Sequence, residues 1–222
     1  MTDLGLALGW AGVLVVGLGG AVRLHRLGLA RTYTRDLVHV GAGVWVLGWP
    51  WWRGTGAPIA IPVAAALATL LAPLSKSGPV ARLRGALAGG DERWTGIVLY
   101  TGSFAVFTTL AFADHSFPAG AALLALALGD GIGGIIGRRF GKHFYAAPGG
   151  KRKSLEGSVV VAIGAAAGVA VASWALGAPG GPGMIAGAAI VAALAEAMAP
   201  RATDNAVVPV AVWAFLRLAV GG

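Results

Sequence analysis

Long apolar stretches recur along the chain and are separated by short segments rich in basic residues, glycine or proline. A helix needs about 20 mainly apolar residues to cross the hydrocarbon core of a bilayer. The first stretch has no basic residue before it, so we expect a retained helix rather than a cleaved signal peptide. The predicted fold class is all-α, with residues 1–222 forming a single transmembrane domain. Eight transmembrane helices are predicted, with seven or nine as alternatives, at Leu4–Val22, Leu37–Trp52, Ala57–Leu74, Trp94–Ala113, Phe117–Gly137, Gly157–Leu176, Pro182–Ala199 and Asn205–Val220.

The composition agrees with a membrane protein and excludes a soluble enzyme. Of the 222 residues, 57% are hydrophobic and 12% are charged, whereas about 25% of residues are charged in a typical soluble domain. No cysteine is present, which removes disulfides and thiolate metal sites from consideration. The high content of alanine and glycine favours a prokaryotic cell membrane.

The charged residues are distributed unevenly between alternate loops. With the N-terminus outside, all 17 Lys and Arg residues except Arg53 and Arg217 lie at the inner side, in line with the positive-inside rule. The net charge of +8 therefore indicates membrane topology and not a nucleic-acid partner. Of the 9 acidic residues, all except Asp3 and Asp114 also map to the inner side, where the rule makes no demand on acids. Ionisable residues beside membrane spans are often functional, so we expect an active site at the cytoplasmic face.

The richest segment is Gly129–Lys142, at the inner end of the fifth predicted helix. Glycine recurs in it at every fourth position, which is typical of closely packed membrane helices. On the neighbouring face, Asp130 is followed by Arg138 and Lys142, with Arg138 about 12 Å from Asp130 along a continuous helix. A carboxylate for a divalent cation, followed by cations for phosphates, is the arrangement that a nucleoside triphosphate requires.

Three further polar segments border predicted helices. Lys153–Ser158 begins the sixth helix, where Ser154 is either a helix cap or part of a phosphate site. Glu196 ends the seventh helix and Asp204 begins the eighth, where Asp204 either caps the helix or contacts a metal or ribose. Arg35 and His39 share one face of the second helix, either as an anchor and a polar contact or as site residues.

Taken together, these motifs resemble the polyprenol kinase family, which includes dolichol, phytol and farnesol kinases and CTP-dependent diacylglycerol kinases, and is related to phosphatidate cytidylyltransferases. The order and spacing are similar over about residues 35–215. The Arg35–His39 segment departs from the family pattern because Asp36 stands where the family has lysine. The segments that carry the resemblance are Arg35–His39, Gly129–Lys142, Lys153–Ser158, Glu196 and Asp204–Pro209.

The resemblance implies a membrane kinase that uses CTP and Mg²⁺ to phosphorylate a lipid alcohol, either a prenol, a phytol-like alcohol or diacylglycerol. The metal ligands that we expect are Asp130, Glu196 and Asp204. Lys153 is expected to act in catalysis, and the base for the lipid hydroxyl is Glu156, Asp204 or His39. The residues expected to bind the nucleotide and its phosphates are Arg35, Gly131, Gly134, Arg138, Arg139, Lys142, Lys151, Ser154 and Asn205.

Two other functions compete with this interpretation. A cytidylyltransferase would release pyrophosphate and form a CDP-lipid, but the additional charged motifs of those relatives near the carboxyl end are missing. A transporter of anions would place its ionisable residues near the middle of the bilayer, whereas the acids here gather at one face. Nothing in the sequence supports an oligomer.

Overall fold

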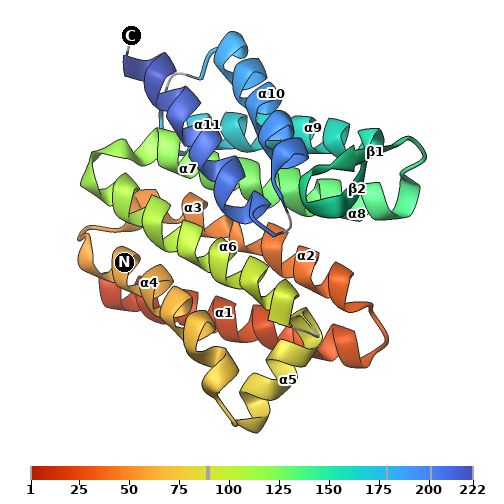
Figure 1. The fold of residues 1–222 in the computed structure, drawn as a ribbon. Helices are drawn as coiled ribbons and strands as arrows, with labels where there is room; N and C mark the ends of the chain where they lie inside the picture. The colour runs from red at the N-terminus through yellow and green to blue at the C-terminus, as the bar shows by residue number, and fades with distance from the viewer. Residues whose placement is uncertain (1, 89–90, 179, 201, 222) are drawn as a thin grey trace.

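The computed structural model describes residues 2–88, 91–178, 180–200 and 202–221, and shows a bundle of helices with one small hairpin (Figure 1). The helices are α1 (Asp3–Arg26), α2 (Arg31–Ala42), α3 (Val44–Leu47), α4 (Gly56–Leu71), α5 (Gly78–Leu87), α6 (Asp91–Leu110), α7 (Ser116–Leu124), α8 (Gly131–Phe140), α9 (Leu155–Ala175), α10 (Pro182–Met198) and α11 (Asp204–Gly221). The shorter elements are the 3-10 turns η1 (Trp49–Trp51), η2 (Ala72–Leu74) and η5 (Pro148–Gly150), the π-helical turns η3 (Ala111–His115) and η4 (Ala125–Asp130), and the strands β1 (Phe144–Ala147) and β2 (Lys151–Ser154).

The helical membrane architecture is confirmed. Within the described part of the chain, 5 helices are long and apolar enough to cross a membrane, and Pro182–Met198 is a shorter apolar helix. The 5 helices are Asp3–Arg26, Gly56–Leu74, Trp94–Ala113, Ser116–Phe140 and Leu155–Ala175. The count of eight spans and the outside position of the N-terminus stay predictions.

The second predicted span is not one continuous helix. The chain over Leu37–Trp52 is divided into α2, α3 and η1, with breaks at Gly43 and Gly48. A side chain at Gly48 would lie 2.6 Å from the Trp10 ring of α1, so glycine is required for this close approach. The apolar pattern predicted the position of the segment but not its breaks, which depend on how it packs against its neighbours.

The segment formed by α7, η4 and α8 lies at the centre of the bundle. Residues Phe117 to Leu124 are all buried, and so are four of the residues in η4. Helices α2, α6, α9 and α11 all contact this segment, while α1, α4 and α5 lie on the far side of α6 (Figure 1). The side chains of this central segment are therefore held by contacts with helices on several sides.

Small residues allow α9 to pack tightly against the central segment, as the glycine spacing predicted. A Cβ atom at Gly133 would lie 3.0 Å from the Gly157 carbonyl oxygen. One at Gly164 would lie 2.7 Å from the Leu128 carbonyl oxygen, and one at Gly168 would lie 2.6 Å from the Leu124 carbonyl carbon. The backbones of the two helices therefore approach one another at successive turns, which only glycine permits.

Substituting Gly164 by alanine is expected to destabilise the protein. The added methyl group would lie 2.7 Å from Leu128 O and 2.9 Å from Gly129 Cα, and these backbone atoms move only if a helix shifts. Overpacking of this kind costs about 1–3 kcal/mol. Thermal unfolding in detergent should show a lower Tm for Gly164→Ala. Gly102→Ala in α6 is the matched control, because its added Cβ would meet no described atom within 4 Å apart from the adjacent backbone of its own helix. An unchanged Tm for Gly164→Ala would contradict the packing.

The hairpin between α8 and α9 was not predicted, and it adds two short strands to the predicted all-α fold. Strands β1 and β2 pair antiparallel, with Tyr145 opposite Lys153. The turn between them uses Gly149 and Gly150, each with φ 78°, a conformation that favours glycine. Because side chains alternate along a strand, Arg152 is exposed while Lys153 points inward.

Candidate active site

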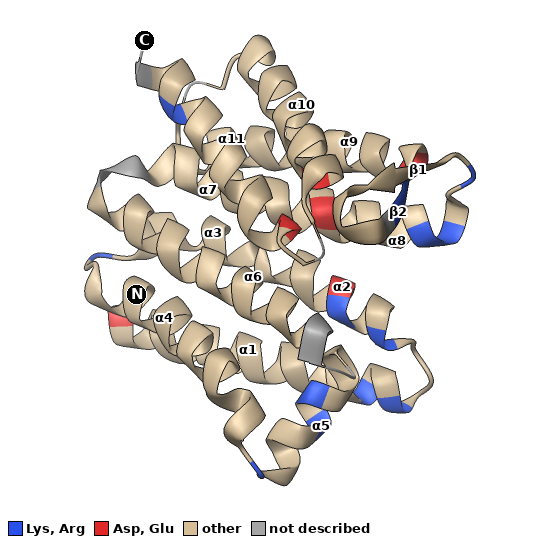
Figure 2. Ribbon diagram, viewed as in Figure 1, with Lys and Arg blue, Asp and Glu red and all other residues tan. Residues whose placement is uncertain are grey.

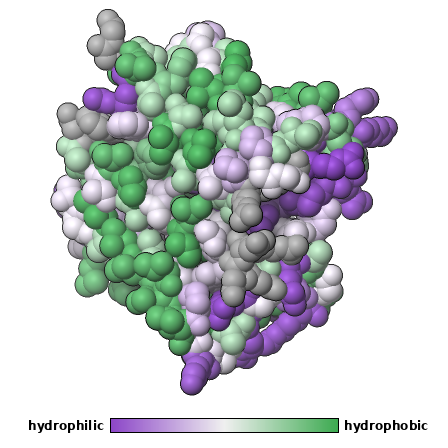
Figure 3. All heavy atoms as spheres, viewed as in Figure 1, coloured by the Kyte–Doolittle hydropathy of each residue, from purple (hydrophilic) through white to green (hydrophobic). Residues whose placement is uncertain are grey.

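Charged side chains gather at one end of the bundle. Figure 2 shows Lys and Arg on α2, α5, α8 and β2, with Asp and Glu between them near the end of α10 and the start of α11. Figure 3 shows the same asymmetry at the surface, since hydrophilic atoms follow one edge and hydrophobic atoms cover much of the remaining face. The uneven distribution of charge that the sequence indicated is therefore present in three dimensions.

Asp130 lies where the central segment changes its helical geometry. It is the last residue of the π-helical turn η4 and directly precedes α8. Single π-helical turns inside α-helices occur frequently at functional sites. Its carboxylate is 21% exposed, and Oδ2 lies 3.8 Å from His39 Nε2. The charges of Asp204, Glu196, Lys153 and Arg35 all act on this carboxylate, so the structure brings together the predicted residues of four separate segments.

His39 is buried beside Asp130 and held by three contacts. Its Nε2 donates to the carbonyl oxygen of Leu126, at 3.2 Å. Its ring centroid lies 3.9 Å from that of Tyr100, whose hydroxyl donates to the His39 carbonyl oxygen at 2.6 Å. The imidazole is 9% exposed. These contacts fix the ring against the central segment, as expected for a residue that positions its neighbours.

Lys153 and Glu196 form an ion pair inside the cluster. Lys153 Nζ lies 2.6 Å from Glu196 Oε1 and also donates to the Glu196 backbone carbonyl. The two side chains are only 10% and 13% exposed. The second carboxylate oxygen, Oε2, is buried and has no hydrogen-bond partner among the described residues. The hairpin thus positions the Lys153 ammonium group of β2 beside the Glu196 carboxylate near the end of α10.

The start of α11 contributes a second buried acceptor. Asn205 Nδ2 donates to the Gly96 carbonyl oxygen at 3.0 Å, while Asn205 Oδ1 is buried with no hydrogen-bond partner in the part of the chain that the structure describes. Ser103 Oγ donates to the Asn205 carbonyl oxygen at 2.7 Å, and the Asn205 backbone N–H donates to Asp204 Oδ1 at 3.1 Å. The α11 start is therefore tied to α6, with an amide oxygen left available for another partner.

The donor set fits a cation that prefers oxygen. No group of three or more His, Asp or Glu side chains is arranged around one point in the described residues. Mg²⁺, however, is usually held by one or two carboxylates together with phosphates and water, and not by a cage of protein ligands. Oxygen ligands of the required kind are supplied by the carboxylate of Asp130 and by two buried acceptors that have no partner within the described ranges, Glu196 Oε2 and Asn205 Oδ1.

Two arginines share one acidic partner beside the cluster. Asp36, on α2, accepts a hydrogen bond from Arg35 Nη2 at 3.4 Å and another from Arg138 Nη2. The Arg138 guanidinium also lies over the Tyr33 ring, 5.5 Å from its centroid. Gly134 faces this guanidinium, because a Cβ atom there would meet Arg138 Nη1 at 3.2 Å. Two of the three predicted phosphate-binding arginines, Arg35 and Arg138, are therefore adjacent.

The remaining predicted residues lie elsewhere. Glu156 is held at the base of the hairpin, where Oε1 lies 2.7 Å from His143 Nδ1. Ser154 is buried and caps α9 by accepting from the Gly157 N–H at 3.1 Å. Gly131 packs against α2, where an added Cβ atom would lie 2.7 Å from Val40 Cγ2. Arg139 and Lys142 lie near the hairpin, and the Lys151 side chain lies outside the described residues.

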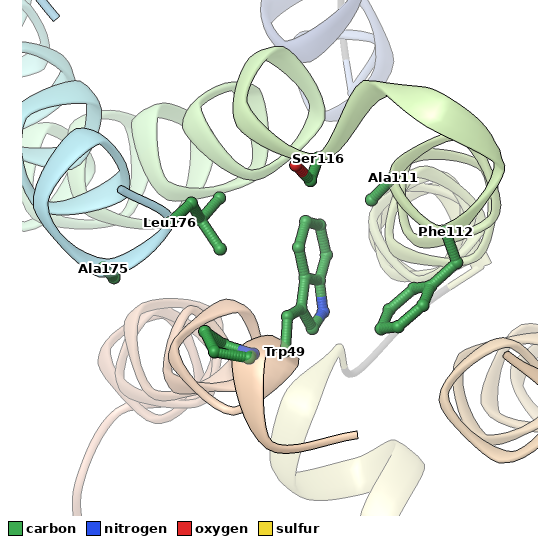
Figure 4. A pocket seen from close by; sticks show the side chains of 7 residues that line it. Trp49, Ala111, Phe112, Ser116, Ala175 and Leu176 are labelled. Atoms are coloured by element: carbon green, nitrogen blue, oxygen red, sulfur yellow. The ribbon is translucent and has the colours of Figure 1, made fainter. Parts of the chain in front are cut away.

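A pocket of about 370 Å³ lies at the other end of the central segment (Figure 4). Trp49, Phe112, Ser116 and Leu176 are among its lining residues. Ser116 begins α7, so the pocket is about 20 Å from Asp130 along the helix axis. The pocket is mainly apolar and is separate from the charged cluster.

Sequence reasoning missed the roles of two residues of the cluster. Asp36 stood out only as a departure from a family segment, although an acid flanked by basic residues at a helix start is a signal for an ion pair. Tyr100 gave no signal, because a single tyrosine inside an apolar helix is indistinguishable from a packing residue. Its contact with His39 joins positions 61 residues apart in sequence.

The fold and cluster define an α-helical membrane protein with a charged site at one end of its bundle. Among curated proteins, the chain is 31% identical over 167 residues to a phytol kinase of Synechocystis sp. and 33% identical over 172 residues to a probable chloroplastic phytol kinase 2 of Oryza sativa subsp. japonica. Each similarity covers 72% of this chain, but only 65% and 55% of the respective relatives. The chain is therefore related to the polyprenol and phytol kinase family, as its motifs predicted. No family model and no solved structure matches it.

Proposed function

We propose that the protein is a lipid alcohol kinase that transfers the γ-phosphate of CTP to the hydroxyl group of a phytol-like or other prenol, or of diacylglycerol. The observation that carries this proposal is the convergence of Asp130, Glu196, Asp204 and Lys153 at one end of the bundle. The similarity to proteins named as phytol kinases supports a lipid alcohol as acceptor, with phytol as the first candidate. The proposed location is a prokaryotic cell membrane, with the site at the cytoplasmic face.

The residues around Asp130 are suited to hold a nucleotide through its phosphates. Asp130 together with Glu196 would hold Mg²⁺, with the Asn205 amide oxygen beside them. The ion would supply charge neutralisation for the phosphates of the nucleotide. Arg35, Arg138 and Lys153 add positive charge, which stabilises the charge that develops on the transferred phosphoryl group.

Asp204 is our candidate for the base that accepts the proton of the lipid hydroxyl. It belongs to the group of charges that act on Asp130. Glu156 instead lies with His143 at the hairpin, and the Nε2–H of His39 donates a hydrogen bond to the Leu126 carbonyl oxygen. The hydroxyl would approach the acids from the bilayer, while its hydrocarbon tail stays between apolar helices.

The proposal is tested with purified protein in detergent, [γ-³²P]CTP, Mg²⁺ and a panel of acceptors. Phytol, farnesol and diacylglycerol are assayed separately, and the labelled lipid is separated by thin-layer chromatography. We expect a labelled monophosphate with at least one alcohol, and faster labelling with CTP than with ATP. If no alcohol is labelled by either nucleotide, the proposal is wrong.

A further inference from the structure

Asp36 joins two basic residues that belong to different helices. Its carboxylate is 7% exposed and accepts from Arg35, its neighbour on α2, and from Arg138, near the end of α8. The guanidinium-bearing side chains are 33% and 36% exposed. One buried acid therefore holds two partly exposed cations side by side, although the two would otherwise repel each other.

The arrangement leaves most of the donors of both arginines available. Each guanidinium carries five N–H donors in a planar fork, and Asp36 accepts from one nitrogen of each. Arg138 is further restrained by the Tyr33 ring, 5.5 Å from its centroid. Planar forks fixed in this way are matched to the oxygen atoms of phosphate groups.

Arg35 connects the arginine pair to the acid cluster, because its charge acts on Asp130 and Asp36 holds Arg138 beside it. Arg35 acts electrostatically on Asp130, on His39 and on Arg138. A polyphosphate that extends from Asp130 would therefore meet both arginines. We infer that Asp36 is a positioning residue that fixes Arg35 and Arg138 as a two-arginine clamp for the phosphates of the nucleotide. This inference rests on the proposed function, because it assumes that a nucleotide binds at Asp130.

Asp36 also has an opposing electrostatic effect, since a carboxylate repels phosphates. Both guanidiniums are about one third exposed, so water and salt screen the repulsion. The loss of orientation is not screened, because a long arginine side chain that is released from its partner samples many rotamers. Positioning should therefore outweigh repulsion, and the removal of Asp36 should weaken nucleotide binding.

The inference is tested by equilibrium binding of [α-³²P]CTP with Mg²⁺ to the purified full chain in detergent. Asp36→Asn is expected to raise the Kd for CTP by about tenfold, which corresponds to the loss of one hydrogen bond between charged groups. Asp36→Glu should restore most of the affinity. In a background that carries both Arg35→Gln and Arg138→Gln, the further change Asp36→Asn should alter the Kd by no more than about twofold, because both groups through which it acts are missing.

A purely structural role for Asp36 gives different results. If Asp36 only joins α2 to α8, the Asp36→Asn variant binds CTP with an unchanged Kd per folded molecule and shows only a lower Tm. An unchanged or lower Kd overturns the inference. Asp3→Asn serves as the matched control. The Asp3 carboxylate lies at the start of α1 and accepts from the Arg53 and Gly54 backbone N–H groups, so it is not part of the arginine pair.

Kinetics separate this inference from the proposed function. In Asp36→Asn, the KM for CTP should rise while the KM for phytol stays unchanged. If the natural chain binds CTP but transfers no phosphate, the proposed function is wrong, while the binding comparison still tests Asp36. If the chain does not bind CTP, both are wrong.

Discussion

Asp130→Asn is expected to abolish lipid phosphorylation without lowering the stability of the protein. The side chains have the same shape, but the amide does not provide the charge that a divalent cation requires. Loss of several kcal/mol of transition-state stabilisation lowers kcat/KM by at least about 10³-fold. The prediction is tested by measuring kcat/KM for phosphorylation of phytol with the purified variant and with the natural chain under the same conditions.

Stability provides the internal control for this variant. The negative charges of Asp204 and Glu196 act on the Asp130 carboxylate, which is also largely buried. A neutral amide relieves this repulsion, so the Tm should stay the same or rise. Asp3→Asn should keep full activity, because Asp3 begins α1 and its carboxylate accepts from Arg53 and Gly54, outside the charged cluster. Full activity in Asp130→Asn would contradict the assignment of Asp130 as a metal ligand.

Lys153→Met is expected to lower both stability and activity. The substitution leaves Glu196 buried with neither carboxylate oxygen paired to a cation. Removing one partner of a buried ion pair typically costs about 3–5 kcal/mol. For a chain of this size, the Tm should fall by roughly 10 °C. Activity should fall by at least about 10²-fold per folded molecule, since a positive charge beside Asp130 is lost.

The double variant Lys153→Met with Glu196→Gln separates these two effects. It removes both charges, so most of the lost stability should return while activity stays low. Lys76→Met, at an exposed lysine outside the cluster, should change neither property. A Lys153→Met variant with an unchanged Tm would show that the ion pair does not contribute to the folded state. Recovery of activity in the double variant would exclude a catalytic role for Lys153.

Much of the architecture could be predicted because a membrane limits the choice of structures. Apolar stretches of about 20 residues must form helices in a bilayer, where each backbone polar group has to find a partner within the helix. The glycines from Gly129 to Gly137 likewise predicted close packing, and α9 supplied the matching glycines at Gly157 and Gly164. These features follow from the local sequence and from the properties of the lipid bilayer.

The parts that could not be predicted depend on contacts between distant segments. The breaks around Gly43 and Gly48 reflect the approach of neighbouring helices, such as Trp10 against Gly48. The hairpin that turns Lys153 toward Glu196 is short, from Phe144 to Ser154, and has little apolar alternation. The sequence placed Glu156 among the candidate bases, whereas in the fold its carboxylate lies with His143. Proximity in sequence is a weak guide to which charged groups meet in space.

The fate of the phosphates of CTP tests the central claim most directly. Purified protein is incubated with phytol and Mg²⁺ and with CTP labelled either at the α- or at the γ-phosphate, and the lipid and nucleotide products are separated. A lipid alcohol kinase places the γ-label in a phytyl monophosphate and leaves the α-label in CDP. If phytol receives no γ-label, and the α-label instead enters a lipid with release of pyrophosphate when phytyl monophosphate is supplied as the acceptor, the protein is a cytidylyltransferase and not a kinase.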